Sequence, residues 1–164
     1  MKENTTVMTS TTQRILIFTA ILSFGAVAAA LISQYAFGMQ PCAWCVLQRL
    51  IYIAIGVVCL ATAWLPAAIR KAGALLTFIL ALCGIAAAWY QITVASQLLS
   101  CAQTFADKFI AGSGLDAALP SVFGIYATCM DAMVKVFGVE YAVWSLGLFV
   151  IVALLGLLGL RRRV

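Results

Sequence analysis

Residues 41–65 read PCAWCVLQRLIYIAIGVVCLATAWL, a pair of cysteines and an arginine followed by a long apolar run. No charged residue occurs between Arg49 and position 69. A helix of about 20 apolar residues is long enough to cross a bilayer. The stretch therefore predicts a membrane-spanning helix with Cys42 and Cys45 in or near its first turn and Arg49 one turn deeper.

The remainder of the chain has the same apolar character. Of its 164 residues, 65% are hydrophobic and 9% are charged, whereas about 25% are charged in soluble domains. The uncharged runs cover residues 15–48, 50–69, 72–106 and 141–160. Because backbone groups in lipid must be satisfied internally, we expect an all-α membrane protein, a four-transmembrane-helix bundle forming one integral domain over residues 1–164. The expected spans are about 15–34, 46–66, 72–94 and 141–160, and the two external loops are about 35–45 and 95–140.

The distribution of charge predicts the orientation. If the spans alternate, one side receives most of the basic residues, which are Lys2, Arg14, Arg70, Lys71, Arg161, Arg162 and Arg163. By the positive-inside rule that side is the cytoplasm. We therefore expect a multi-pass protein of the bacterial inner membrane, with both termini in the cytoplasm and both long loops in the periplasm. This flanking pattern explains the net charge of +5. We therefore expect the chain to contact membrane lipid and not to bind nucleic acid.

Topology divides the six cysteines into two groups. Cys59 and Cys83 fall near the middle of spans and are interpreted as small packing residues. The others fall at or beyond the periplasmic edge of the membrane, where disulfides form and persist. These are Cys42, Cys45, Cys101 and Cys129.

The periplasmic cysteines could be structural staples, zinc ligands or redox groups. A disulfide between Cys101 and Cys129 would close a 29-residue loop, worth about 3.6 kcal/mol in the chain-entropy model, whereas Cys42 with Cys45 would give only about 1.9 kcal/mol. A zinc site normally has two close pairs, and this chain has one close pair and no His. We therefore expect no metal and interpret Cys42 and Cys45 as a redox pair.

The residues around this pair favour a reactive thiolate. Pro41 suits the start of a helix, where free backbone N–H groups and the helix dipole stabilise negative charge. Arg49 follows Cys45 by four residues, on the same helical face, and should favour a Cys45 thiolate. A cation at this depth is expected to be functional, although an arginine that only reaches to the lipid headgroups is the alternative.

The electrons taken by such a pair need an acceptor. The chain has no GxGxxG motif and no His for haem, and it has too few cysteines for both an iron–sulfur cluster and a redox pair. A quinone fits a site at the lipid boundary, because guanidinium binds its carbonyl oxygens and stabilises its reduced forms. We expect a quinone, either ubiquinone or menaquinone, beside Cys45 and Arg49.

These features resemble the DsbB family of bacterial disulfide bond formation proteins. The shared motifs are PCxxCxxQR at Pro41, Cys42, Cys45, Gln48 and Arg49, LPSVF at 119–123 ahead of Cys129, and Gly138 and Trp144 before the last span. The chain departs from the family at Ala43 and Trp44, where many members have Pro and Leu, at Val134, where they have Trp, and at Asp131, where they have Glu.

The resemblance implies a protein thiol:quinone oxidoreductase. Its Cys101–Cys129 disulfide would accept electrons from a periplasmic DsbA-like thioredoxin-fold partner, which attacks Cys101. Cys129 would then attack Cys42 and release Cys45 as a thiolate near Arg49 and the quinone. Each step is exchange through a mixed disulfide. The alternatives are a non-enzymatic tetraspan protein with stapled loops, and a similar protein that moves electrons in the opposite direction.

Two predictions concern the long second loop. Residues 131–140, DAMVKVFGVE, form either a short helix on the membrane surface or an ordinary loop. The GSG at 112–114 predicts a hinge or a turn.

Overall fold

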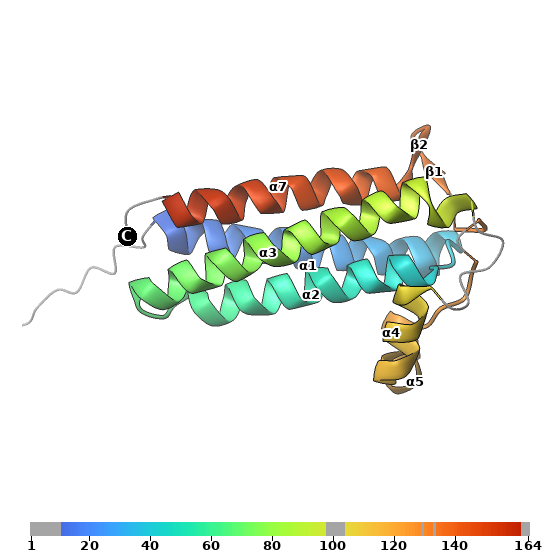
Figure 1. The fold of residues 1–164 in the computed structure, drawn as a ribbon, viewed down its shortest axis with the longest axis horizontal. Coiled ribbons are helices and arrows are strands. Elements are labelled where there is room, and N and C mark those ends of the chain that lie inside the picture. The colour runs from blue at the N-terminus through green and yellow to red at the C-terminus, as the bar shows by residue number, and fades with distance from the viewer. Residues whose placement is uncertain (1–10, 98–103, 129, 133, 162–164) are drawn as a thin grey trace, which may run out of the picture.

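The computed structural model describes residues 11–97, 104–128, 130–132 and 134–161. Within these residues four helices are long and apolar enough to cross a membrane. They are α1 (Thr11–Phe37), α2 (Ala43–Ala63), α3 (Ala67–Thr93) and α7 (Tyr141–Arg161), and Figure 1 shows them aligned as one bundle. The predicted all-α, four-helix membrane fold is confirmed. The α2 helix begins and ends earlier than the predicted span, because Pro41 precedes its start and Pro66 separates it from α3.

The four helices form a ring in which α2 packs on α1, α3 on α2 and α7 on α3, and α1 and α7 share the smallest of the four interfaces. Glycines allow the closest approach between α3 and α7. A Cβ at Gly84 would collide with the ring of Phe149, and a Cβ at Gly156 would come within 3.0 Å of the Phe78 backbone nitrogen in α3. Small residues at helix interfaces are typical of membrane bundles, where tight packing drives association.

The connections gather the remaining elements at one end of the bundle (Figure 1). After α3 come a 3-10 turn (Ala95–Gln97) and three short helices, α4 (Phe105–Ser113), α5 (Leu115–Ala118) and α6 (Pro120–Phe123). The hydroxyl of Thr104 caps α4 by accepting from the Asp107 N–H. Gly114 ends α4 with φ of 69°, the left-handed conformation that glycine adopts easily. Of the predicted hinge or turn at 112–114, only Gly114 forms a turn between two helices, because Gly112 and Ser113 are the last residues of α4.

A β-hairpin occupies the stretch where a surface helix was one of two expectations. Strand β1 (Lys135–Val136) pairs antiparallel with β2 (Val139–Glu140). The linking residues Phe137 and Gly138 both have positive φ, 52° and 81°, as a two-residue type I′ turn requires. The expectation of a helix is wrong for the described part of 131–140, because this turn reverses the chain. The indole N–H of Trp144 donates to the Val136 carbonyl at 3.2 Å and ties the hairpin to α7.

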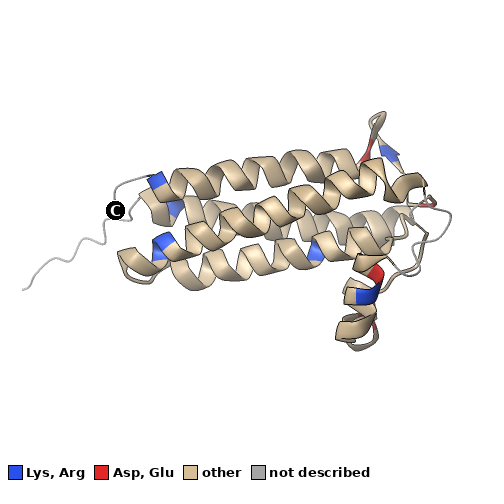
Figure 2. Ribbon diagram, viewed as in Figure 1, with Lys and Arg blue, Asp and Glu red and all other residues tan. Residues whose placement is uncertain are grey.

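Charged side chains divide between the two ends of the bundle. Figure 2 shows only basic residues where α1 and α3 begin and α7 ends, whereas the end that carries α4 and the hairpin holds the acidic residues together with Lys108 and Lys135. This asymmetry is the one on which the predicted orientation depends. The cytoplasmic location of the termini stays a prediction.

Candidate active site

The cysteine pair lies at the start of α2, where Pro41 leads into the helix. Cys42 is the N-cap residue, with φ of −88° and ψ of 171°, and its carbonyl accepts the first helical hydrogen bond from the Val46 N–H at 3.0 Å. Cys45 follows in the first turn, and the two sulfur atoms lie 3.1 Å apart. Cys42 is fully buried and Cys45 is partly exposed. Thiols this close can form a disulfide with little movement of the helix.

The two cysteines differ in their surroundings. The hydrogen bond with Cys45 and the burial of its own side chain raise the pKa of the Cys42 thiol well above its usual value. The Cys45 sulfur accepts a hydrogen bond from the Gln91 side-chain amide of α3, at 3.2 Å. In the reduced pair, negative charge is therefore better carried by Cys45.

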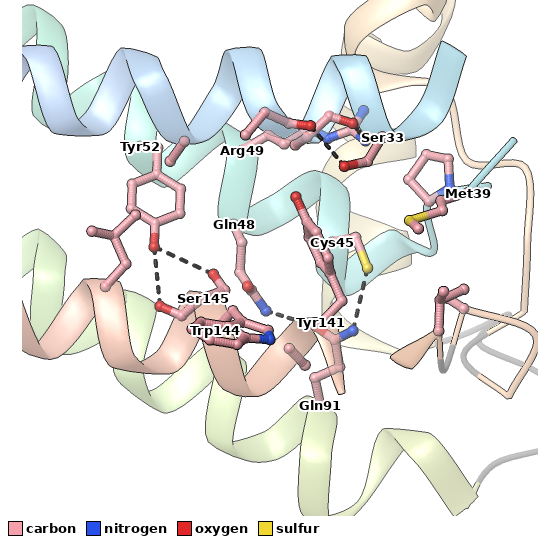
Figure 3. A pocket seen from close by; sticks show the side chains of 18 of the residues that line it. Ser33, Met39, Cys45, Gln48, Arg49, Tyr52, Gln91, Tyr141, Trp144 and Ser145 are labelled. Carbon is pink, nitrogen blue, oxygen red and sulfur yellow. Dashed lines mark hydrogen bonds between the residues drawn. The ribbon is translucent and has the colours of Figure 1, made fainter. Parts of the chain in front are cut away.

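Gln91 of the neighbouring helix α3 links two residues of α2, Gln48 and Cys45, through its side-chain amide. Its Oε1 accepts from Gln48 Nε2 at 2.6 Å, while its Nε2 donates to Cys45 and, at 3.7 Å, to Cys42. Figure 3 shows Cys45, Gln91 and Gln48 linked in this order. Gln48 and Gln91 are both buried. Sequence reasoning missed Gln91, although an amide within an apolar span was a usable signal.

Arg49 is buried, with 5% of its surface exposed. Its Nη1 donates to Gln34 Oε1 at 2.7 Å and to the Val122 carbonyl at 3.1 Å, and its Nη2 donates to the Ala30 carbonyl at 3.3 Å. The guanidinium therefore points into the protein, which argues against the headgroup-anchor alternative. All three acceptors are neutral, so the positive charge remains available to attract an anion or a polarised oxygen.

A cavity of about 250 Å³ lies beside the cysteine pair, among α1, α2 and α7. Cys45 and Arg49 both line it, and Figure 3 shows both among the side chains that surround it. At the deeper end the Tyr52 hydroxyl donates to the Ser145 carbonyl at 3.0 Å. The other walls are largely apolar, formed by Ala26, Ala29, Ala30, Ala142 and Leu148. An apolar cavity with a few polar groups at defined positions is typical of a small-molecule site.

Part of the second loop docks against the segment that precedes Cys42. The N–H groups of Tyr126 and Ala127 donate to the Pro41 carbonyl, at 3.0 and 3.2 Å. Phe123 is buried in a cluster that includes Cys42. The predicted catalytic residues Cys101 and Cys129 lie outside the described residues, but Ala127 precedes Cys129 by only two positions.

The two mid-span cysteines have different environments. Cys59 is buried, and its sulfur lies 3.1 Å from the Thr77 hydroxyl. Cys83 is exposed on the outer surface of α3. The interpretation as packing residues therefore fits Cys59 but is wrong for Cys83, because the sequence does not reveal which face of α3 turns outward.

The chain is similar to known proteins over nearly its whole length. The family model for disulfide bond formation protein DsbB matches residues 12–159. A disulfide bond formation protein B of Ralstonia nicotianae is 34% identical over 145 residues, 88% of this chain and 91% of that protein. The protein of the same description from Cupriavidus necator is 32% identical, and the match covers 88% of this chain and 89% of that protein. The one from Pseudomonas syringae pv. tomato is also 32% identical, over 87% of this chain and 86% of that protein.

Proposed function

The chain belongs to the DsbB family of disulfide bond formation proteins, and we propose that it oxidises a periplasmic DsbA-like thioredoxin-fold dithiol protein and passes the electrons to a membrane quinone. The net reaction converts the dithiol of the partner into a disulfide while the quinone becomes a quinol. The proposed location is the bacterial inner membrane, with both termini cytoplasmic and the cysteine pair at the periplasmic end. The observation that carries the proposal is that Cys45 and Arg49 line the same apolar cavity.

The residues of the cavity fit a quinone. Its apolar walls suit a hydrophobic ring, and its position among membrane helices suits a lipid-soluble molecule. An arginine has five N–H donors, and the recorded bonds of Arg49 use three of them, so the guanidinium retains donors for a carbonyl oxygen. When bound, a quinone supplies an acceptor for two electrons and two protons.

The chain's own residues control the charge of the thiol pair. Gln91 holds the Cys45 sulfur by donating to it, and the Gln48 amide fixes the orientation of Gln91. The hydrogen bond with Cys45 and burial raise the pKa of the Cys42 thiol. Cys45 is therefore the sulfur proposed to face the acceptor, and Cys42 the sulfur proposed to exchange with the second loop.

The docked loop supports exchange between Cys129 and Cys42. The Ala127 N–H bonds to the carbonyl of Pro41, the residue directly before Cys42. Only Thr128 lies between Ala127 and Cys129 in the sequence. The family resemblance adds the preceding step, in which the partner attacks Cys101 of the Cys101–Cys129 disulfide.

A matched pair of cysteine variants tests this function. Cys45→Ser should abolish quinone-dependent oxidation of the reduced partner, whereas Cys83→Ser should leave it unchanged, because Cys83 lies outside the cavity. Full activity of Cys45→Ser would favour the non-enzymatic tetraspan alternative, in which the cysteines only staple the loops. Reduction of the partner at the expense of a quinol would favour electron flow in the opposite direction.

A further inference from the structure

Arg49 makes one contact that crosses from the membrane bundle to the second loop. Its Nη1 donates both to Gln34 of α1 and to the Val122 carbonyl of α6. The second of these bonds joins residues 73 positions apart in the sequence. A cation that lines the cavity is thus held partly by a backbone oxygen of the loop.

The turn that carries this oxygen is itself fixed to α1. The Tyr35 hydroxyl donates to the Ser121 carbonyl at 2.7 Å, the carbonyl directly before that of Val122. Within the turn, the N–H groups of Phe123 and Gly124 bond to the Leu119 and Pro120 carbonyls, each at 2.9 Å. Tyr35 therefore binds the carbonyl adjacent in sequence to the one that Arg49 binds.

We propose that the turn 119–124 positions Arg49 in the acceptor site, with Tyr35 as the residue that holds the turn in place. Tyr35 is a positioning residue in this arrangement, because it is absent from the cavity lining while Arg49 is part of it. The consequence for the quinone depends on the proposed function. The coupling between the turn and Arg49 does not depend on it.

The direction of the effect follows from the hydrogen bonds. Without the tie from Tyr35, the Val122 carbonyl samples more orientations, and the guanidinium loses part of one of its fixed acceptors. A less ordered guanidinium binds the quinone carbonyl less well, because binding must then also supply the entropy cost of fixing the Arg49 side chain. The reaction of the partner with the second-loop disulfide does not use Arg49, so its rate should not change.

Two tyrosines offer a matched comparison. The Tyr35 hydroxyl ties the turn to α1, whereas the Tyr126 hydroxyl donates at 2.9 Å to Pro120, within the turn itself. Tyr35→Phe and Tyr126→Phe each remove one hydroxyl from an exposed ring, and both variants should fold. Tyr35→Phe should raise the quinone concentration for half-maximal rate by about 3- to 10-fold, the effect of losing part of a hydrogen bond. Tyr126→Phe should change it by less than about twofold. Equal effects of the two changes, or no effect of Tyr35→Phe, would overturn the role of Tyr35.

Amide hydrogen exchange tests the coupling without any quinone. Arg49→Met and Arg49→Lys should each increase exchange at the Phe123 and Gly124 amides relative to wild type, and Tyr35→Phe should do the same. The amide of Val94 at the end of α3, which bonds to the Tyr90 carbonyl at 2.9 Å, serves as the reference and should not change. Unchanged exchange in the turn of both Arg49 variants would contradict the proposal. A wild-type protein that reduces no quinone would refute the proposed function and leave this exchange result to decide the coupling.

Discussion

The side-chain amide of Gln91 donates to the Cys45 sulfur across 3.2 Å, from the third membrane helix to the second. The same amide accepts from Gln48, one residue before Arg49. A neutral donor thus holds the Cys45 sulfur, while the cation of Arg49 lines the same cavity as that sulfur. A sulfur held in this way is better stabilised as a thiolate than as part of a disulfide, because the disulfide carries no charge.

Replacing Gln91 should therefore shift the redox equilibrium of the pair. Gln91→Leu removes the donor, destabilises the reduced pair and lowers its reduction potential. A hydrogen bond to a charged group contributes about 1.5–3 kcal/mol, which corresponds to about 30–65 mV for two electrons. The potential is measured by equilibration in thiol–disulfide buffers and alkylation of the free thiols. Gln97→Leu, an exposed glutamine after α3, is the control, and an unchanged potential in Gln91→Leu would argue against the amide as a thiolate donor.

Changes at Arg49 should separate the effect of charge from that of geometry. Arg49→Lys keeps the charge but loses the planar set of donors, so the apparent quinone affinity should fall by about 10- to 150-fold if one charge-assisted bond is lost. Arg49→Met should lower it further. Arg161→Met, at the far end of α7, should have no effect. Quinone titration at fixed reduced partner measures these affinities, and an unchanged quinone dependence in Arg49→Met would move the acceptor site elsewhere.

Filling the cavity should block the acceptor and spare thiol exchange. Ala29 lines the cavity, whereas Ala28, its exposed neighbour on α1, does not. Ala29→Leu should raise the quinone concentration for half-maximal rate by about 10-fold or more, since overpacking costs about 1–3 kcal/mol. Ala28→Leu should resemble wild type. Mixed-disulfide formation with the partner, followed in a single turnover, should proceed at the same rate in both variants. If the two variants also show the same dependence on quinone concentration, the quinone does not occupy this cavity.

The sequence predicts part of this site well, for local reasons. Pro41 and the uncharged run after Arg49 indicate where α2 begins, and the spacing of Cys45 and Arg49 places them on one face of it. The amide of Gln91 within an apolar span was a signal that a polar contact exists, but its partner Cys45 was out of reach, because that contact depends on how α3 packs against α2. The Val122 carbonyl was equally out of reach, since every residue carries a backbone oxygen and only the fold brings this one to Arg49.

The hairpin and Cys83 show two further limits of sequence reasoning. The apolar residues of 134–139 fit one face of a helix as well as a strand, and the pattern of hydrophobicity does not report the positive φ of Phe137. For Cys83, the neighbouring residues of α3 are apolar on all sides of the helix. Composition therefore predicts that the helix lies in the membrane, but it does not predict which side faces the other helices.

The orientation of the chain can be tested with single cysteines in a background that lacks the native ones. Lys108→Cys, in α4, should react with a membrane-impermeant maleimide added to intact spheroplasts. Ala68→Cys, in the first turn of α3, should react only after the membrane is permeabilised. The reverse pattern of labelling would overturn the charge argument and place the cysteine pair on the cytoplasmic side.

The central claim is that electrons pass from a protein dithiol to a quinone through this chain. The most direct measurement follows both reactions together, without oxygen, using the purified protein, an excess of a reduced DsbA-like partner and a limiting amount of quinone. The account predicts that one partner disulfide forms for each quinone reduced, and that Cys42→Ser and Cys45→Ser abolish both reactions. Oxidation of the partner without matching loss of quinone, or quinone reduction that persists in Cys45→Ser, would contradict it.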